Sequence, residues 1–312
     1  MALEHLIVAS DFQGWGGGSS NVSSIKAFSD FLSESYDPSK THVHINGDLV
    51  DFHPVANGKI FQDPLSEKSQ DLLEKSLTDL LEKENISSEE VEKAKTSLYA
   101  QYAVKDYIEQ AEGAFKSITD NGFTQTAVIG NNEQRVYTMG QVDKSSAKEI
   151  SSLLRQRISQ NTGMTFIDDS KVHDLSGIST FSLPYINDPA FSISGDVETT
   201  QDGSEYDQMK KNIDTSVNAL FMHGNLQDND DEAKGIKKYL AEYEGDTLWV
   251  FSGHRGKGGV KGVINDKGSK IIYVNSNTGT LDDGRTCQFV YDAEIENGKI
   301  TAITEYIQVK NS

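Results

Sequence analysis

The sequence contains one cysteine, five prolines and no long hydrophobic run. A single cysteine, Cys287, excludes an intrachain disulfide and a zinc site built from several thiolates. The apolar runs, such as residues 5–9 and 248–251, are much shorter than the roughly 20 residues that a helix needs to cross a bilayer, so we expect no membrane-spanning segment. Residues 1–15 lack the basic and apolar regions of a secretory signal. We therefore expect a cytoplasmic protein.

Positive charge is also scarce. The chain has 29 Lys and Arg against 48 Asp and Glu, which gives a formal net charge of −19. A surface of this sign repels nucleic acid and anionic lipid, so it disfavours a nucleic-acid partner without excluding one. With 36% hydrophobic and 25% charged residues, the composition is typical of a globular protein with a solvated acidic surface.

Short apolar runs alternate with helical patterns along most of the sequence. Five of these runs have the composition of β-strands and meet a glycine at or soon after their end: 5–10, 41–47, 125–130, 218–224 and 247–253. This alternation predicts an α/β fold, in which active-site residues gather at the carboxyl ends of the strands. Residues 259–309 favour strands throughout, and the pair Asn297 and Gly298 predicts a β-hairpin.

The segment 65–119 has helical periodicity and almost no glycine or proline. Ser87 and Glu90 have the spacing of a helix capping box, which divides the segment into two helices. We predict a helical hairpin inserted into a single domain of residues 1–312. The hairpin could serve as a lid, as a surface for a protein partner or as scaffolding. One helical face is expected to carry four leucines: Leu73, Leu77, Leu80 and Leu81.

Polar side chains follow the predicted strands in a regular way. Because the carboxyl ends of neighbouring strands can meet at one rim, these side chains are candidates for a shared metal site. Carboxylate, carboxamide and imidazole groups around one ion suit Mn²⁺, Fe²⁺ or Zn²⁺. The candidates are Asp11 and Gln13 in SDFQG, Asp48 in GDLVD, Asn131 in GNNE, His223 in FMHG and His254 in SGHRG.

The order of these motifs resembles the calcineurin-like metallophosphoesterase superfamily. The pattern of that family is D-x-H, G-D-x-x-D, G-N-H-[DE], an isolated His after a strand, and G-H-x-H, and the resemblance spans residues 5–309. It implies a four-layer αββα sandwich of two mixed β-sheets flanked by helices, with the segment 65–119 as an insertion. It also implies a hydrolase that cleaves a phosphodiester or phosphoanhydride, in a small phosphorylated substrate or nucleotide, by attack of metal-bound water.

Carried over residue by residue, the resemblance implies one strong metal site and one weakened site. The weakened site would use Asp11, Asp48 and Gln13, because Gly256 stands where the family has a second histidine. The D-x-Q first motif is similar to that of the manganese-dependent ADP-ribose/CDP-alcohol diphosphatases, so we expect Mn²⁺, with Fe²⁺, Zn²⁺ and Mg²⁺ as alternatives. The strong site would consist of Asp48, Asn131, His223 and His254.

The residues expected to act on the substrate depart from the family pattern. Asn132 replaces a histidine that protonates the leaving group, and a carboxamide can donate a hydrogen bond to phosphate but cannot act as a general acid. Arg255 is expected to contact the phosphate through its planar guanidinium. His53 could replace the missing acid, or it is a solvated loop histidine. The alternative function is a catalytically impaired binding or scaffold protein of the same fold, which Asn132 and Gly256 favour.

Overall fold

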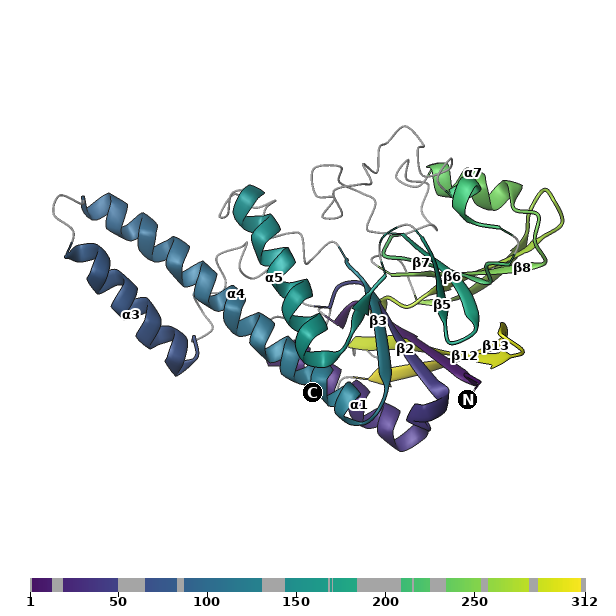
Figure 1. Cartoon of the computed structure of the whole chain (residues 1–312), viewed down its shortest axis with the longest axis horizontal. Helices are drawn as coiled ribbons and strands as arrows, with labels where there is room; N and C mark the ends of the chain where they lie inside the picture. Colours follow the sequence, from purple (N-terminus) through teal and green to yellow (C-terminus); the bar gives the residue numbers. More distant parts are fainter. Residues whose placement is uncertain are drawn as a thin grey trace.

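The computed structural model of this chain describes residues 2–12, 19–49, 65–82, 87–130, 144–167, 169, 171–183, 209–214, 216–224, 234–253, 258–280 and 286–309. Two mixed β-sheets lie face to face, and helices cover the outer face of each sheet (Figure 1). The architecture is therefore the expected four-layer α/β sandwich.

The first sheet, sheet A, has seven strands in the order β11-β12-β1-β2-β3-β4, with β13 paired to β12. Strands β1 to β4 run parallel to one another, and β12 runs antiparallel to β1. Asn297 and Gly298 both have positive φ in the turn between β12 and β13, which confirms the predicted hairpin. The bounds are β1 (His5–Ala9), β2 (Thr41–Asn46), β3 (Thr124–Val128), β4 (Thr165–Phe166), β11 (Thr278–Thr280), β12 (Thr286–Glu296) and β13 (Lys299–Val309).

The second sheet, sheet B, has six strands in the order β5-β6-β7-β8-β10-β9. The four inner strands are parallel, and the edge strands β5 and β9 are antiparallel to their neighbours. The predicted strands at 218–224 and 247–253 are β7 and β8. The bounds are β5 (Val172–Leu175), β6 (Ile178–Leu183), β7 (Ala219–Met222), β8 (Thr247–Ser252), β9 (Gly259–Ile264) and β10 (Lys270–Asn275).

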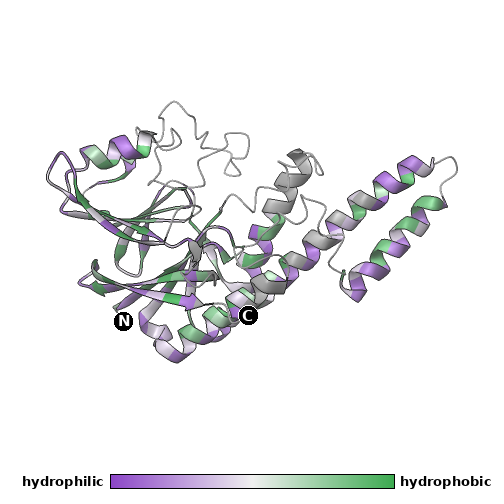
Figure 2. Cartoon of the chain, turned by 180° about the vertical axis from the view of Figure 1, so that it is seen from behind, coloured by the Kyte–Doolittle hydropathy of each residue, from purple (hydrophilic) through white to green (hydrophobic). Residues whose placement is uncertain are grey.

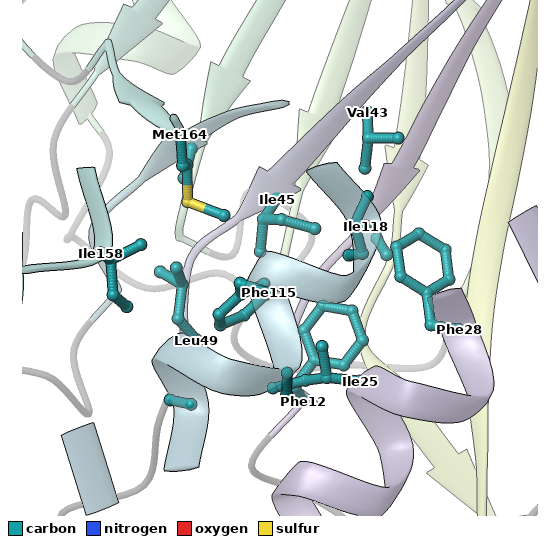
Figure 3. Close-up of a cluster of buried hydrophobic side chains, with 14 of the residues drawn as sticks. Phe12, Ile25, Phe28, Val43, Ile45, Leu49, Phe115, Ile118, Ile158 and Met164 are labelled. Carbon is teal, nitrogen blue, oxygen red and sulfur yellow. The ribbon is translucent and has the colours of Figure 1, made fainter. Parts of the chain in front are cut away.

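Three layers of apolar side chains hold the sandwich together. The helices α1 (Ser19–Ser35), α4 (Ser88–Asp120) and α5 (Lys144–Thr162) pack on the outer face of sheet A, where Phe12, Phe28 and Phe115 are fully buried (Figure 3). Helix α7 (Lys234–Glu242) covers sheet B. The apolar strands face one another in the middle (Figure 2). None of the described helices is long and apolar enough to cross a membrane.

The predicted helical hairpin consists of α3 (Glu67–Leu81) and α4, and it projects away from the sheets (Figure 1). Ser87 and Glu90 form the expected capping box at the start of α4. The C-terminal half of α4 is part of the layer that covers sheet A, because Phe115 and Ile118 are fully buried there. Leu81 was expected to lie on the same packed helical face as Leu73, Leu77 and Leu80, but it does not. It is 63% exposed at the end of α3, where the described part of the chain does not cover it.

Two histidines of β2 are buried and hydrogen-bonded to β3. His42 Nδ1 is hydrogen-bonded to Thr124 Oγ1 (3.0 Å) and His42 Nε2 to Thr126 Oγ1 (2.8 Å). His44 Nδ1 is hydrogen-bonded to the same Thr126 hydroxyl (2.9 Å), and its ring stacks on Phe221 of the other sheet. Burial lowers the pKa of His42 from 6.5 to about 4, and burial lowers the pKa of His44 well below its ordinary value.

His42 is expected to make the protein sensitive to acid. Its folded pKa of about 4 lies below the unfolded value of 6.5, so the unfolded chain binds more protons between these two values. The contribution of neutral His42 is complete above pH 6.5 and is lost as the pH falls towards 4. A shift of this size corresponds to about 3 kcal/mol. Urea unfolding at pH 7 and pH 4.5 measures it, and a His42→Asn protein with an unchanged pH dependence would contradict the assignment.

Candidate metal centre

The candidate metal centre lies where the carboxyl ends of strands from both sheets meet. Asp11 follows β1, Asp48 follows β2 and His223 follows β7. All three side chains are buried, with at most 1% of each residue exposed. One potential ligand atom of each lies within 4.8 Å of those of the other two. Three of the predicted metal ligands, distant in the sequence, are thus brought together by the fold.

The histidine of this cluster has a defined orientation. His223 Nδ1 donates a hydrogen bond to the backbone oxygen of Asn46 (2.7 Å), and His223 Nε2 faces Asp48 Oδ1 (3.3 Å). Burial alone would lower the pKa of His223, but the charge and hydrogen bond of Asp48, followed by the charge of Asp11, raise it to about 9. The two carboxylates therefore stabilise positive charge at the position of His223. Two carboxylates and one imidazole fit a divalent cation such as Mn²⁺, Fe²⁺ or Zn²⁺.

The backbone at both aspartates is in the left-handed region. Asp11 has φ 56° and Asp48 has φ 53°, and only four non-glycine residues in the described ranges have positive φ. The other two, Ser176 and Asn297, lie in turns between adjacent strands. A left-handed residue costs about 1–2 kcal/mol, although aspartate tolerates this conformation better than most residues. Such strain clusters at functional sites, where the surrounding structure maintains it.

Three glycines allow the chain to approach the cluster closely. A Cβ atom at Gly47 would clash with the ring of His223, and one at Gly130 would clash with the backbone nitrogen and carboxylate of Asp48. A Cβ atom at Gly253 would lie 2.8 Å from Asp11 Oδ2 and 3.1 Å from His223 Nδ1. The ends of β3 and β8 therefore also reach the centre, because Gly130 and Gly253 lie just beyond these strands.

Buried hydroxyl groups hold the carboxylate of Asp11. Ser10 Oγ donates to Asp11 Oδ2, and it also lies 2.9 Å from the backbone oxygen of Ser276, just beyond β10 of sheet B. Ser276 Oγ donates to Ser10 Oγ (3.0 Å), and Gln288 Nε2 of β12 donates to the backbone oxygen of Ser10 (2.8 Å). Ser10, Ser276 and Gln288 are fully buried. These contacts fix the orientation of Asp11 from both sheets.

Ser10→Ala is expected to weaken Mn²⁺ binding about tenfold, because hydrogen bonds to a ligand are typically worth about 10–100-fold in metal affinity. Isothermal titration of the metal-free protein with Mn²⁺ measures this change. Ser182→Ala is the matched control, because Ser182 is equally buried in β6 and its Oγ has no hydrogen-bond partner among the described residues. Equal affinities of the two variants would show that Ser10 does not support the centre.

The remaining predicted site residues fall outside the described part of the chain: Gln13, His53, Asn131, Asn132, His254 and Arg255. Gly130 and Gly253, which directly precede Asn131 and His254 in the sequence, are described and lie against the cluster. Sequence reasoning missed Ser10 and Asn46. Their contacts join the two sheets, and a one-dimensional motif contains no information about such contacts.

Comparison with known proteins gives little further guidance. No family model matches the chain, and no curated protein matches it. A search of solved structures aligns 98% of this chain with the whole of a hypothetical protein from Thermus thermophilus, at 9% sequence identity and a TM-score of 0.38. Similarity at this level carries no information about function.

Proposed function

We propose that this protein is a divalent-metal-dependent phosphohydrolase that cleaves a phosphodiester or phosphoanhydride in a small molecule or nucleotide. The observation that carries the proposal is the convergence of Asp11, Asp48 and His223, buried and within 4.8 Å of one another, at positions that match a metallophosphoesterase motif order. Mn²⁺ is the first choice of metal, with Fe²⁺, Zn²⁺ and Mg²⁺ as alternatives. A cation of this kind supplies Lewis-acid activation of water and of the phosphoryl group.

The described residues support specific roles within this proposal. Asp48 would belong to both a strong and a weakened site, because it lies beside His223 and within ligand distance of Asp11. Asn131 and His254 would complete the strong site. Their neighbours Gly130 and Gly253 lie against Asp48 and Asp11, and consecutive Cα atoms are only about 3.8 Å apart. Gln13 would complete the weakened site.

The proposed substrate-binding residues favour phosphoanhydrides over alkyl phosphodiesters. Asn132 would donate a hydrogen bond to a phosphate oxygen, and Arg255 would bind the phosphate through two parallel hydrogen bonds. Neither group can protonate a leaving oxygen near neutral pH, and His53 is the remaining candidate for that role. A phosphate leaving group needs protonation less than an alkoxide does. Replacement of the acidic histidine by Asn132 should therefore lower the rate of hydrolysis less for a phosphoanhydride than for an alkyl phosphodiester.

Metal titration and two substrates test the proposal. Chelator-treated protein is expected to be inactive on bis-p-nitrophenyl phosphate and on ADP-ribose, and Mn²⁺ is expected to restore hydrolysis with faster turnover of ADP-ribose. Calorimetry is expected to show one tight and one weaker Mn²⁺ equivalent per chain. Hydrolysis that is insensitive to the chelator would refute a metal-dependent mechanism.

The second candidate is a binding or scaffold protein that retains the fold and the metal but not turnover. The projecting hairpin favours it, because Ser69 is the single buried residue of α3 in the described chain and Leu81 is 63% exposed. Metal binding without hydrolysis of either substrate would support this function.

For both candidate functions we propose a cytoplasmic location, since the one cysteine, Cys287, is buried and cannot form an intrachain disulfide.

A further inference from the structure

Asn46 joins the two sheets at the candidate metal centre. It is the last residue of β2 in sheet A and is fully buried. Its side-chain Nδ2 donates a hydrogen bond to the backbone oxygen of Met222 (2.9 Å), the last residue of β7 in sheet B. In the opposite direction, the backbone oxygen of Asn46 accepts a hydrogen bond from His223 Nδ1 (2.7 Å). Two hydrogen bonds thus connect the ends of β2 and β7.

We infer that Asn46 is a positioning residue that holds two metal ligands, Asp48 and His223, at the correct separation across the sheets; this inference rests on the proposed metal-dependent function. Asp48 lies two residues after Asn46, just beyond β2 of sheet A. His223 lies one residue after Met222, just beyond β7 of sheet B. The bond from Asn46 to Met222 therefore sets the spacing between the two turns that carry the ligands. The resulting distance between His223 Nε2 and Asp48 Oδ1 is 3.3 Å.

The second bond sets the chemistry of the imidazole. A neutral histidine has one ring nitrogen that donates and one that accepts. Because the Asn46 carbonyl can only accept, a proton stays on Nδ1, so Nε2, which faces Asp48, is the nitrogen that would bind a metal ion in place of a proton. Gly47 allows this arrangement, since any side chain there would occupy the space of the His223 ring. The geometry accounts for the buried carboxamide of residue 46 at the end of β2.

A shorter or apolar side chain at residue 46 cannot reach the Met222 carbonyl. The carbonyl would remain buried without this donor, and the β7 turn would be held less firmly relative to β2. The expected effect is looser placement of His223 relative to Asp48. The affinity for a metal ion depends steeply on such geometry, so the centre should lose affinity even though both ligands are still present.

Asn46→Ala tests the inference, with Asn218→Ala as the matched control. Asn218 is also a buried asparagine next to β7, at the opposite end of that strand. Its Oδ1 accepts a hydrogen bond from the backbone nitrogen of Ile300 (2.7 Å) in β13, so it too joins sheet B to sheet A. The control removes the same kind of bond without touching the centre. Asn46→Ser serves as a milder variant if the alanine protein does not fold.

Three measurements on the full-length protein distinguish the outcomes: Mn²⁺ affinity by calorimetry, the visible absorption spectrum of bound Co²⁺, and the urea midpoint of the metal-free protein. We expect both alanine variants to unfold at lower urea. Only the Asn46 variants should bind Mn²⁺ about 10–100-fold more weakly and change the Co²⁺ spectrum. Wild-type affinity and spectrum in the Asn46 variants would overturn this inference alone. A wild-type protein that binds neither ion would overturn the proposed function and this inference with it.

Discussion

Asp48→Asn is expected to reduce Mn²⁺-dependent hydrolysis by about a thousandfold, which is the scale of losing a preorganised electrostatic group at a reaction centre. The substitution keeps the shape of the side chain but removes its charge. Asp48 is fully buried beside His223, and its carboxylate is one of the two negative charges of the described centre. Initial rates on ADP-ribose over a range of Mn²⁺ concentrations measure the effect.

The control for Asp48→Asn is Asp292→Asn. Asp292 is also a buried carboxylate of sheet A, but it contacts His5 (3.0 Å) and Tyr36 (3.1 Å) and belongs to β12. Its loss is expected to reduce stability without changing the dependence of the rate on Mn²⁺. If Asp48→Asn and Asp292→Asn lost activity in parallel with stability, Asp48 would contribute to folding and not to metal-dependent hydrolysis.

Gly47→Ala is expected to have the second-largest effect, a loss of Mn²⁺ affinity of about a hundredfold. The added methyl group would overlap the ring of His223, whose position is fixed by its hydrogen bond to Asn46. The ring must therefore move away from Asp48, or the turn that carries Asp48 must move. Gly47 also has φ +86°, which costs an alanine about 1–2 kcal/mol independently of the clash. Calorimetry with Mn²⁺ and urea unfolding separate the two effects.

Gly268→Ala isolates the backbone effect. Gly268 has φ +84°, almost the same as Gly47, but a Cβ atom there would meet nothing within 4 Å. The control should lose stability and keep full metal affinity, whereas Gly47→Ala should lose both. Wild-type affinity in the Gly47→Ala protein would mean that the ring of His223 does not need its observed position.

Much of the fold follows from local patterns in the sequence. The five runs that end near glycine are β1, β2, β3, β7 and β8, and the Asn297–Gly298 turn forms the predicted hairpin. These features depend on side-chain alternation and turn chemistry, which are local. The sequence predicts the extent of α4 but not what covers it, because its outer half packs on α3 and its inner half on sheet A with the same helical period. Periodicity shows that a face is apolar but not what covers it.

The candidate centre was predictable only in part. The order of the motifs indicated Asp11, Asp48 and His223, and the structure brings these residues together. It did not indicate Ser10 or Asn46, because their roles depend on the register between sheet A and sheet B. That register is set by packing between strands that are far apart in the chain, so no spacing rule contains it. The one sequence feature that points to Ser10 and Asn46 is that each is a polar residue at the end of a buried strand, and many residues share this feature.

The strand order of sheet A has a consequence for the biosynthesis of this protein. β1 lies between β2 and β12, and Gln288 of β12 binds the backbone of Ser10 across a separation of 278 residues. A nascent chain on the ribosome therefore cannot complete this sheet until residues 286–296 have been translated. Contacts of such long range also slow folding. Until then one edge of β1 has no strand partner, and an unpaired strand edge of this kind exposes a folding chain to aggregation.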